Sequence, residues 1–280
     1  MNPYIQSLRL RTLPLSVSGI ILGTGLAGWL RWDVFALAIS TTLCLQILSN
    51  LANELGDALK GTDENQKGRA AYGLQSGKIT KHQIIGMIEL FALLSVASGI
   101  ALIWVTFGTL ICTQSAIFLG LGLLAIIGAV TYTLGKHSYG YYGLGDLGVF
   151  LFFGLLSTLG AFYLQTQWMT NEVIWLGIAI GLPCVGVLNL NNIRDMSNDR
   201  LHGKRTFASL LGPIGARCYH STLLTGCLSI ALIFGHWWTL CVLPLWIWHL
   251  WFVWSHSKKL DKQMPVLMFS TLIVAVLCIF

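Results

Sequence analysis

Long apolar runs separated by short polar stretches make up almost the whole chain. Nine runs are close to the length of about 20 residues that a helix needs to cross a bilayer. They span residues 13–30, 34–58, 83–106, 109–130, 147–166, 172–192, 214–235, 237–255 and 264–280. The runs are continuous rather than alternating, which favours helices that satisfy their own backbone hydrogen bonds in lipid over a β-barrel. The pattern therefore predicts an all-α membrane protein with nine transmembrane helices in a single domain, 1–280.

Basic residues give these runs a direction. When the runs are threaded in order, every one of the 17 Lys and Arg residues except Arg31 falls on the side of the N-terminus. Cytoplasmic loops carry the excess of Lys and Arg in membrane proteins. We therefore expect a multi-pass protein of the cytoplasmic (inner) membrane, with the N-terminus in the cytoplasm and the basic loops near anionic lipid headgroups. The net charge of +6 then reflects topology, and we expect no nucleic-acid partner.

The overall composition agrees with a membrane protein. Hydrophobic residues make up 55% and charged residues 10% of the chain, whereas a soluble domain carries about 25% charge. The seven cysteines lie in apolar segments without Cys-x-x-Cys spacing, which argues against a disulfide framework or a zinc site. The first apolar run is long for a signal peptide and more runs follow it, so we expect it to be a retained helix.

Two polar stretches with similar patterns end the second and sixth runs. In the first stretch, Asn53 and Asp57 are four residues apart, which places them on one face of a helix. In the second, Asn191, Asp195 and Asp199 repeat at the same spacing. Carboxylates are costly at membrane depth and mark function there. Ligand sets of oxygen atoms alone suit a hard cation, so the two stretches together predict a Mg²⁺ site shared with a diphosphate.

Basic side chains next to both stretches support a phosphate ligand. Arg69, Arg194, Lys204 and Arg205 would neutralise the outer phosphate oxygens. Asp63 follows a glycine turn that returns the chain toward the first stretch. A single acidic pair at a helix end is most often a solvated cap, but two clusters with one spacing, at equivalent helix ends, favour a shared site.

A third stretch, 132–146, combines glycines, tyrosines, one lysine and one acid. Its composition is more typical of a glycine-bent loop with interfacial tyrosines than of a site. In a functional interpretation, Lys136 would bind a carboxylate or phosphate. The tyrosine rings would shield a cation through their π faces. Asp146 opens the fifth run, where an N-cap is its structural alternative.

These blocks resemble the UbiA superfamily of intramembrane aromatic prenyltransferases, and more narrowly its branch that prenylates 1,4-dihydroxy-2-naphthoate. The likeness rests on Asn50 to Asp63, on Gly-Tyr-Tyr-Gly-Leu-Gly-Asp at 140–146, on 191–206, and on Arg-Leu-Arg-Thr-Leu-Pro at 9–14. It covers nearly the whole chain. One position departs from the pattern: Glu54 stands where such enzymes usually have Asp. We expect this longer acid either to shift the metal geometry or to bind the metal through water.

The resemblance implies a bundle of nine transmembrane helices around a central cavity, open to the cytoplasmic side and laterally to lipid. It also implies transfer of an all-trans polyprenyl group from its diphosphate to 1,4-dihydroxy-2-naphthoate, with loss of CO₂ and diphosphate, giving demethylmenaquinone. The implied Mg²⁺ ligands are Asn53, Asp57, Asn191, Asp195 and Asp199. The implied catalytic residues are Asp57, Asp195, Asp199, Lys136 and Tyr139, the last two orienting the acceptor. The implied substrate-binding residues are Asn50, Asp63, Arg69, Tyr132, Asp146, Asn192, Arg194, Lys204 and Arg205.

Other interpretations remain open at this point. The same fold would accept 4-hydroxybenzoate, a chlorin, haem or homogentisate, although the block at 143–146 disfavours them. A cation-coupled transporter would also carry buried acids, but near the membrane midplane. Here the acids lie at helix ends beside basic loops, which favours a phosphate site. A purely structural membrane protein would leave the paired acid stretches unexplained.

Overall fold

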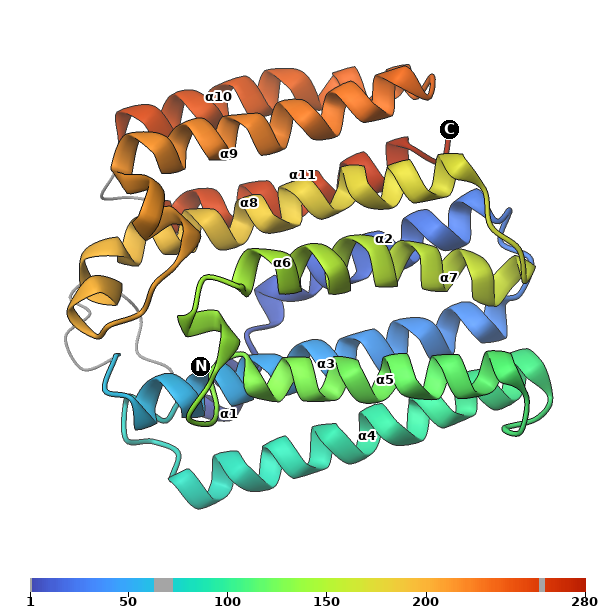
Figure 1. The fold of residues 1–280 in the computed structure, drawn as a ribbon, viewed down its shortest axis with the longest axis horizontal. Coiled ribbons are helices and arrows are strands. Elements are labelled where there is room, and N and C mark those ends of the chain that lie inside the picture. Colours follow the sequence, from blue (N-terminus) through green and yellow to red (C-terminus); the bar gives the residue numbers. More distant parts are fainter. Residues whose placement is uncertain (1, 63–72, 257–259) are drawn as a thin grey trace.

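The computed structural model describes residues 2–62, 73–256 and 260–280, and these residues are almost entirely helical (Figure 1). The α-helices are α1 (Pro3–Leu8), α2 (Leu13–Leu26), α3 (Trp32–Leu59), α4 (Lys81–Phe107), α5 (Thr113–Thr131), α6 (Gly145–Val149), α7 (Ser157–Thr166), α8 (Asn171–Leu201), α9 (Phe207–Ile233), α10 (Leu243–Ser255) and α11 (Gln263–Leu277). Shorter helical segments are η1 (Leu10–Thr12), η2 (Tyr139–Tyr141), the π-helix η3 (Phe150–Leu156), η4 (Trp237–Val242) and η5 (Leu260–Lys262). The predicted all-α class is confirmed.

Seven helical stretches in the described residues are long and apolar enough to cross a membrane. They are Trp32–Leu59, Lys81–Phe107, Thr113–Thr131, Gly145–Thr166, Asn171–Leu201, Trp237–Ser255 and Leu260–Leu277. The two other predicted spans form helices outside this set. One is α2, which has 14 residues, and the other is α9, whose helical geometry is interrupted at Gly212 (φ 73°, ψ 176°). The count of nine spans therefore stays a prediction.

The long helices run back and forth between two ends of the molecule (Figure 1). Helices α3, α5, α8 and α10 all end on the side where the N-terminus lies, and the C-terminus lies at the opposite end. This alternation brings the ends of α3 and α8, which carry the two acidic stretches, to one side. The orientation of that side toward the cytoplasm remains a prediction.

Local sequence signals position the elements around this end. Thr206 caps α9 by accepting a hydrogen bond from the Ser209 amide at 3.1 Å, while the Ser209 hydroxyl accepts one from the Thr206 amide at 3.0 Å. Such a reciprocal capping box fixes where a helix begins. In the middle of the bundle, Gly154 of η3 lies so close to α8 that a Cβ there would be 2.5 Å from the Cα of Gly181. The two glycines therefore let η3 approach α8 closely.

Candidate active site

The ends of α3 and α8 border a cavity of about 360 Å³. Its polar lining includes Asn50, Asn53, Asp57, Asn191, Asp195 and Asp199. Its apolar lining includes Leu15, Ala125, Ala129, Phe152, Phe153 and Leu156. Phe152, Phe153 and Leu156 all belong to η3, and π-helical segments occur frequently at functional sites. The cavity therefore joins an acid-rich end to an apolar interior.

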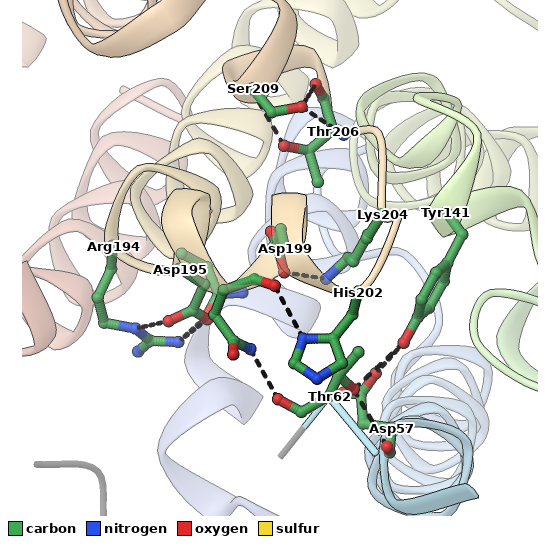
Figure 2. Close-up of polar contacts among 12 residues, drawn as sticks. Asp57, Thr62, Tyr141, Arg194, Asp195, Asp199, His202, Lys204, Thr206 and Ser209 are labelled. Atoms are coloured by element: carbon green, nitrogen blue, oxygen red, sulfur yellow. Dashed lines mark hydrogen bonds and ion pairs between the residues drawn. The ribbon is translucent and has the colours of Figure 1, made fainter. Parts of the chain in front are cut away.

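Neutral donors hold the first acidic stretch. The Tyr141 hydroxyl donates to a carboxylate oxygen of Asp57 at 3.0 Å, and Figure 2 shows the ring pointing directly at that carboxylate. The Thr62 hydroxyl donates to the backbone carbonyl of Asp57 at 3.1 Å. Asn53 lies one turn before Asp57 on α3, and its amide oxygen accepts a hydrogen bond from the Thr133 hydroxyl at 3.1 Å. Asp57 therefore has its carboxylate oriented by a phenol.

Cations hold the second stretch. The Arg194 guanidinium donates to Asp195 from Nε at 2.7 Å and from a second nitrogen, in a two-pronged contact drawn in Figure 2. The same guanidinium donates to the amide oxygen of Asn191 at 2.6 Å and forms an ion pair with Asp261 before α11. Bidentate Arg–carboxylate pairs combine strength with a defined geometry. Arg194 thus orients two of the predicted metal ligands at once.

Asp199 has a cation of its own. Its carboxylate lies 3.4 Å from the Lys204 ammonium, and the two side chains are only 3% and 11% exposed. The other carboxylate oxygen of Asp199 is buried and has no hydrogen-bond partner within the described part of the chain. Burial lowers the pKa of Lys204, but the carboxylates of Asp199 and Asp57 outweigh that effect, and the pKa is raised above its usual value. The surrounding carboxylates therefore favour the charged form of Lys204.

Direct contacts join the two stretches and the tyrosine-rich loop. The Asn198 side-chain amide donates to the Thr62 carbonyl at 2.7 Å, which ties α8 to the end of α3. The Arg205 amide donates to the Tyr141 carbonyl at 3.0 Å, and the Lys204 ammonium lies 5.5 Å from the centre of the Tyr141 ring. Three stretches far apart in sequence therefore meet at one end of the cavity.

The cavity includes most of the residues proposed for the site from sequence. Ten of them line it, namely Asn50, Asn53, Asp57, Tyr132, Tyr139, Asn191, Arg194, Asp195, Asp199 and Lys204. Lys136 and Arg205 instead line a second pocket. Asn192 and Asp146 are not among the residues that line either pocket. Asp63 and Arg69 lie outside the described residues.

The structure changes the interpretation of two acidic residues, Glu54 and Asp146, for which the sequence offered alternatives. Glu54 is fully buried and accepts a hydrogen bond from the Leu74 amide at 2.8 Å, away from the residues that line the cavity. Because adjacent residues differ by about 100° around a helix, Glu54 cannot share the face of Asn53. Asp146 is not the N-cap of α6, since Leu144 occupies that position and Asp146 lies in the first turn.

Several residues around the cavity escaped the sequence analysis. Tyr141 and Thr62 contact Asp57, and Asp261 contacts Arg194. The opening arginines, Arg9 and Arg11, also line the cavity, although the sequence offered them only as part of a family-like block. Nothing in the sequence distinguishes Tyr141 from its neighbouring tyrosines, because a loop has no periodicity from which direction can be inferred.

Tyr132 and Tyr139 form an aromatic corner of the cavity. Their rings meet edge to face with centroids 5.3 Å apart. The Tyr139 hydroxyl donates to the Gly128 carbonyl at 3.0 Å, which anchors the loop to α5. Burial raises the pKa of Tyr139 to about 12, so the phenol stays neutral. The pair thus presents uncharged aromatic rings beside the acidic end.

Comparison with known proteins decides the family. The sequence pattern of the UbiA prenyltransferase family matches residues 13–275. The chain belongs to the UbiA prenyltransferase family. A 1,4-dihydroxy-2-naphthoate octaprenyltransferase of Escherichia coli is 44% identical over 235 residues, which cover 83% of this chain and 76% of that protein. A protein of the same name from Mycobacterium tuberculosis is 32% identical, covering 86% of this chain and 81% of the relative.

Solved structures of the family share the fold. The apo structure of a UbiA homolog from Aeropyrum pernix superposes with a TM-score of 0.70 at 18% identity, covering 95% of this chain and 96% of that one. A UbiA homolog from Archaeoglobus fulgidus bound to GPP and Mg²⁺ superposes with a TM-score of 0.69 at 14% identity, covering 99% and 97%. The helical bundle described above is therefore the UbiA fold.

The donor set fits a magnesium ion that is completed by its substrate. Among the described residues, no three Asp, Glu, His or Cys side chains lie close enough to enclose a metal by themselves. Asp57, Asp195 and Asp199 instead line one cavity from two helices, with an unpartnered buried oxygen on Asp199. Mg²⁺ is usually held by one or two carboxylates together with substrate phosphates. Carboxylates placed on two helices around one cavity are consistent with this mode of Mg²⁺ binding.

Proposed function

We propose that this UbiA-family prenyltransferase transfers an all-trans polyprenyl group from polyprenyl diphosphate to 1,4-dihydroxy-2-naphthoate. CO₂ and diphosphate leave, and the product is demethylmenaquinone. Relatives at 44% and 32% identity that are named for this acceptor support the proposal. The observation that carries it is the cavity, in which acids and cations at one end adjoin an apolar interior. A prenyl diphosphate has the same division between a charged head and an apolar tail.

The proposed metal ligands are the five cavity-lining side chains on α3 and α8. They are Asn53, Asp57, Asn191, Asp195 and Asp199. When bound there, Mg²⁺ would neutralise the diphosphate and make it a better leaving group. The bound GPP and Mg²⁺ of the Archaeoglobus fulgidus homolog support this dependence on a divalent cation.

Fixed cations complete the proposed diphosphate site. Lys204 lines the cavity next to Asp199 and adds positive charge where the leaving group develops negative charge. Arg194 keeps Asp195 and Asn191 in place through its guanidinium. These groups are in position before substrate arrives, so no reorganisation is needed during the reaction.

The apolar part of the cavity suits the prenyl tail and the allylic cation. Phe152, Phe153 and Leu156 surround the space beyond the acids. The rings of Tyr132 and Tyr139 face the same cavity, and aromatic faces stabilise cations. Exclusion of water by these side chains would protect the cation from hydrolysis. We assign acceptor orientation to Tyr139, because Lys136 lies in the second pocket.

We further propose that the acid-lined end opens toward the cytoplasm and that the protein resides in the inner membrane. The ends of α3, α5, α8 and α10 lie on one side of the molecule, and the loops that follow them carry most of the basic residues. Basic loops face the cytoplasm. A cysteine placed at exposed Lys78 should react with an impermeant maleimide only after the cytoplasmic face is opened.

The decisive assay uses protein reconstituted in lipid with polyprenyl diphosphate, Mg²⁺ and 1,4-dihydroxy-2-naphthoate labelled with ¹⁴C in its carboxyl group. We expect Mg²⁺-dependent release of ¹⁴CO₂ together with a lipid-soluble quinone. A parallel reaction contains 4-hydroxybenzoate. Prenylation of hydroxybenzoate without reaction of the naphthoate would overturn the acceptor but keep the prenyltransferase. Inactivity with both acceptors would contradict the proposal.

A further inference from the structure

A second pocket lies beside the active-site cavity, among the loops at the same end of the molecule. It has a volume of about 400 Å³. Lys60, Lys136 and Arg205 line it together with Ser138 and Tyr141, and no acidic side chain is among its described lining residues. Three positive charges without an acid among those residues favour a ligand with several negative charges.

Tyr141 links this pocket to the acidic end of the cavity. Its hydroxyl contacts Asp57, which lines the cavity, and Tyr141 itself lines the second pocket. The Lys60 ammonium lies 3.7 Å from the centre of the ring, and Lys204 of the cavity lies 5.5 Å from the same centre. One aromatic ring therefore lies close to a cation of each pocket.

Lys60 is held in place rather than free in solution. Its ammonium donates to the Thr133 carbonyl at 2.8 Å and to the Ser138 hydroxyl. Burial lowers the pKa of Lys60; Asp57 acts in the opposite direction, and the nearby ammonium of Lys204 lowers it again. A bound anion would relieve this repulsion between the two ammonium groups. The pocket is thus positioned and charged to receive an anion that leaves the cavity.

We propose that the second pocket binds inorganic diphosphate without a metal ion and receives it after its release from the cavity. This inference rests on the proposed function, because that reaction produces diphosphate in the cavity that contains Asp57, the contact of Tyr141. A diphosphate carries several negative charges, which match Lys60, Lys136 and Arg205 better than a single carboxylate does. The metal-free site would be distinct from the acid-lined one, where carboxylates repel a diphosphate unless a cation is present.

Binding is tested without turnover, so its failure is separate from a failure of the prenyltransferase proposal. Protein in phosphatidylcholine nanodiscs is titrated calorimetrically with inorganic diphosphate in the presence of EDTA. We expect one site in the wild type. Lys136→Gln and Arg205→Gln should each weaken it by about tenfold, as expected for loss of one charge-assisted contact. Asp199→Asn should not weaken it, because that carboxylate belongs to the cavity.

Arg200→Gln is the matched control. Arg200 is an exposed cation in the same region, but it donates to the Ser209 carbonyl and does not line the pocket. Its removal should leave the affinity within about twofold of wild type, well inside the expected loss for one contact. Absence of metal-free binding, or equal binding in Lys136→Gln and Arg205→Gln, would overturn the inference.

Two further arms distinguish other anions. In nanodiscs that contain phosphatidylglycerol, diphosphate should still bind at the same site. Abolished binding there would show that a lipid headgroup occupies the pocket and would contradict the proposal. Tighter binding of 1-hydroxy-2-naphthoate than of diphosphate would also contradict it, because the pocket would then be an acceptor site.

Discussion

The two acidic stretches look alike in sequence but are held by different chemistry. Asp57 on α3 accepts a hydrogen bond from the phenol of Tyr141, whereas Asp195 and Asp199 on α8 are paired with Arg194 and Lys204. Within the described part of the chain, the Asp57 carboxylate therefore forms no direct ion pair. In the second stretch, each of the two acids has a cation as its direct partner. Equal spacing along the two helices therefore does not give equal electrostatics.

This difference in charge partners predicts different contributions of the two stretches to substrate binding. A cation is attracted more strongly to a carboxylate that has only a neutral partner than to one already paired with a guanidinium. In the proposed site, we therefore expect the α3 stretch to contribute more of the attraction for Mg²⁺, and Lys204 beside the α8 stretch to attract phosphate oxygens. Substitutions in and around the two stretches test this difference, from the largest expected effect to the smallest.

Removal of a carboxylate from either stretch should have the largest effect. Asp57→Asn and Asp199→Asn should each lower kcat by about 10³, or about 4 kcal/mol, the upper range for losing one electrostatic group at an active site. Asp33→Asn is the control, because Asp33 pairs with Arg31 in the first turn of α3, far along the helix from the site. Turnover of ¹⁴C-labelled naphthoate measures all three. Wild-type turnover in either site variant would refute a shared acid site.

Removal of the cation from the second stretch should mainly affect stability. Arg194→Ala would leave Asp195 and Asp261 without their shared guanidinium, and breaking a buried pair costs about 3 kcal/mol. Thermal unfolding in detergent measures the loss. Arg200→Ala, which removes an exposed arginine from the same helix, should change the free energy of unfolding by less than about 0.5 kcal/mol. Similar behaviour of the two variants would show that Arg194 is not a structural anchor.

Loss of the neutral donor from the first stretch should change metal use. Tyr141→Phe removes the hydrogen bond to Asp57 but keeps the ring beneath Lys60. We expect kcat/KM to fall about tenfold, with a higher Mg²⁺ concentration at half-maximal activity, because a charge-assisted hydrogen bond contributes about 1.5 kcal/mol. Tyr142→Phe on the same loop is the control. An unchanged Mg²⁺ dependence in Tyr141→Phe would remove Tyr141 from the metal site.

Shortening Glu54 should have the smallest effect on the reaction. Glu54→Asp withdraws the carboxylate from the Leu74 amide, so unfolding should become easier by about 1 kcal/mol. Its Mg²⁺ midpoint should match the wild type, since Glu54 does not line the cavity. Glu54→Gln keeps an acceptor oxygen and serves as the isosteric comparison. A shift of the Mg²⁺ midpoint in Glu54→Asp would return this residue to the metal site.

Helical periodicity allowed the sequence to predict which polar side chains share one face of a helix. Asn53 and Asp57 on α3, and Asn191, Asp195 and Asp199 on α8, face one cavity because four-residue spacing fixes a helix face. Charge partners were harder to predict from the sequence, because Arg194 pairs with Asp261, a residue 67 positions away.

The contacts of loop residues could not be predicted, because a loop has no regular spacing. Lys136 and Tyr141 belong to a stretch without regular spacing, so the sequence does not reveal that one borders a separate pocket and the other contacts Asp57. The sequence linked Glu54 to the metal site because it is an acid next to Asn53. Its position one residue further along the helix points it elsewhere, to the Leu74 amide. The apolar part of the cavity was also hidden, since any long helix offers similar side chains.

A double-mutant cycle on Asp57 and Asp195 tests most directly whether the two stretches form one site. The kcat/KM for polyprenyl diphosphate is measured in Asp57→Asn, Asp195→Asn and the double variant, all at saturating Mg²⁺. Residues that act as a unit lose function non-additively. We expect the double variant to be no more than about tenfold worse than the poorer single variant. Losses that multiply would show that the two acids act independently and would contradict a shared diphosphate site.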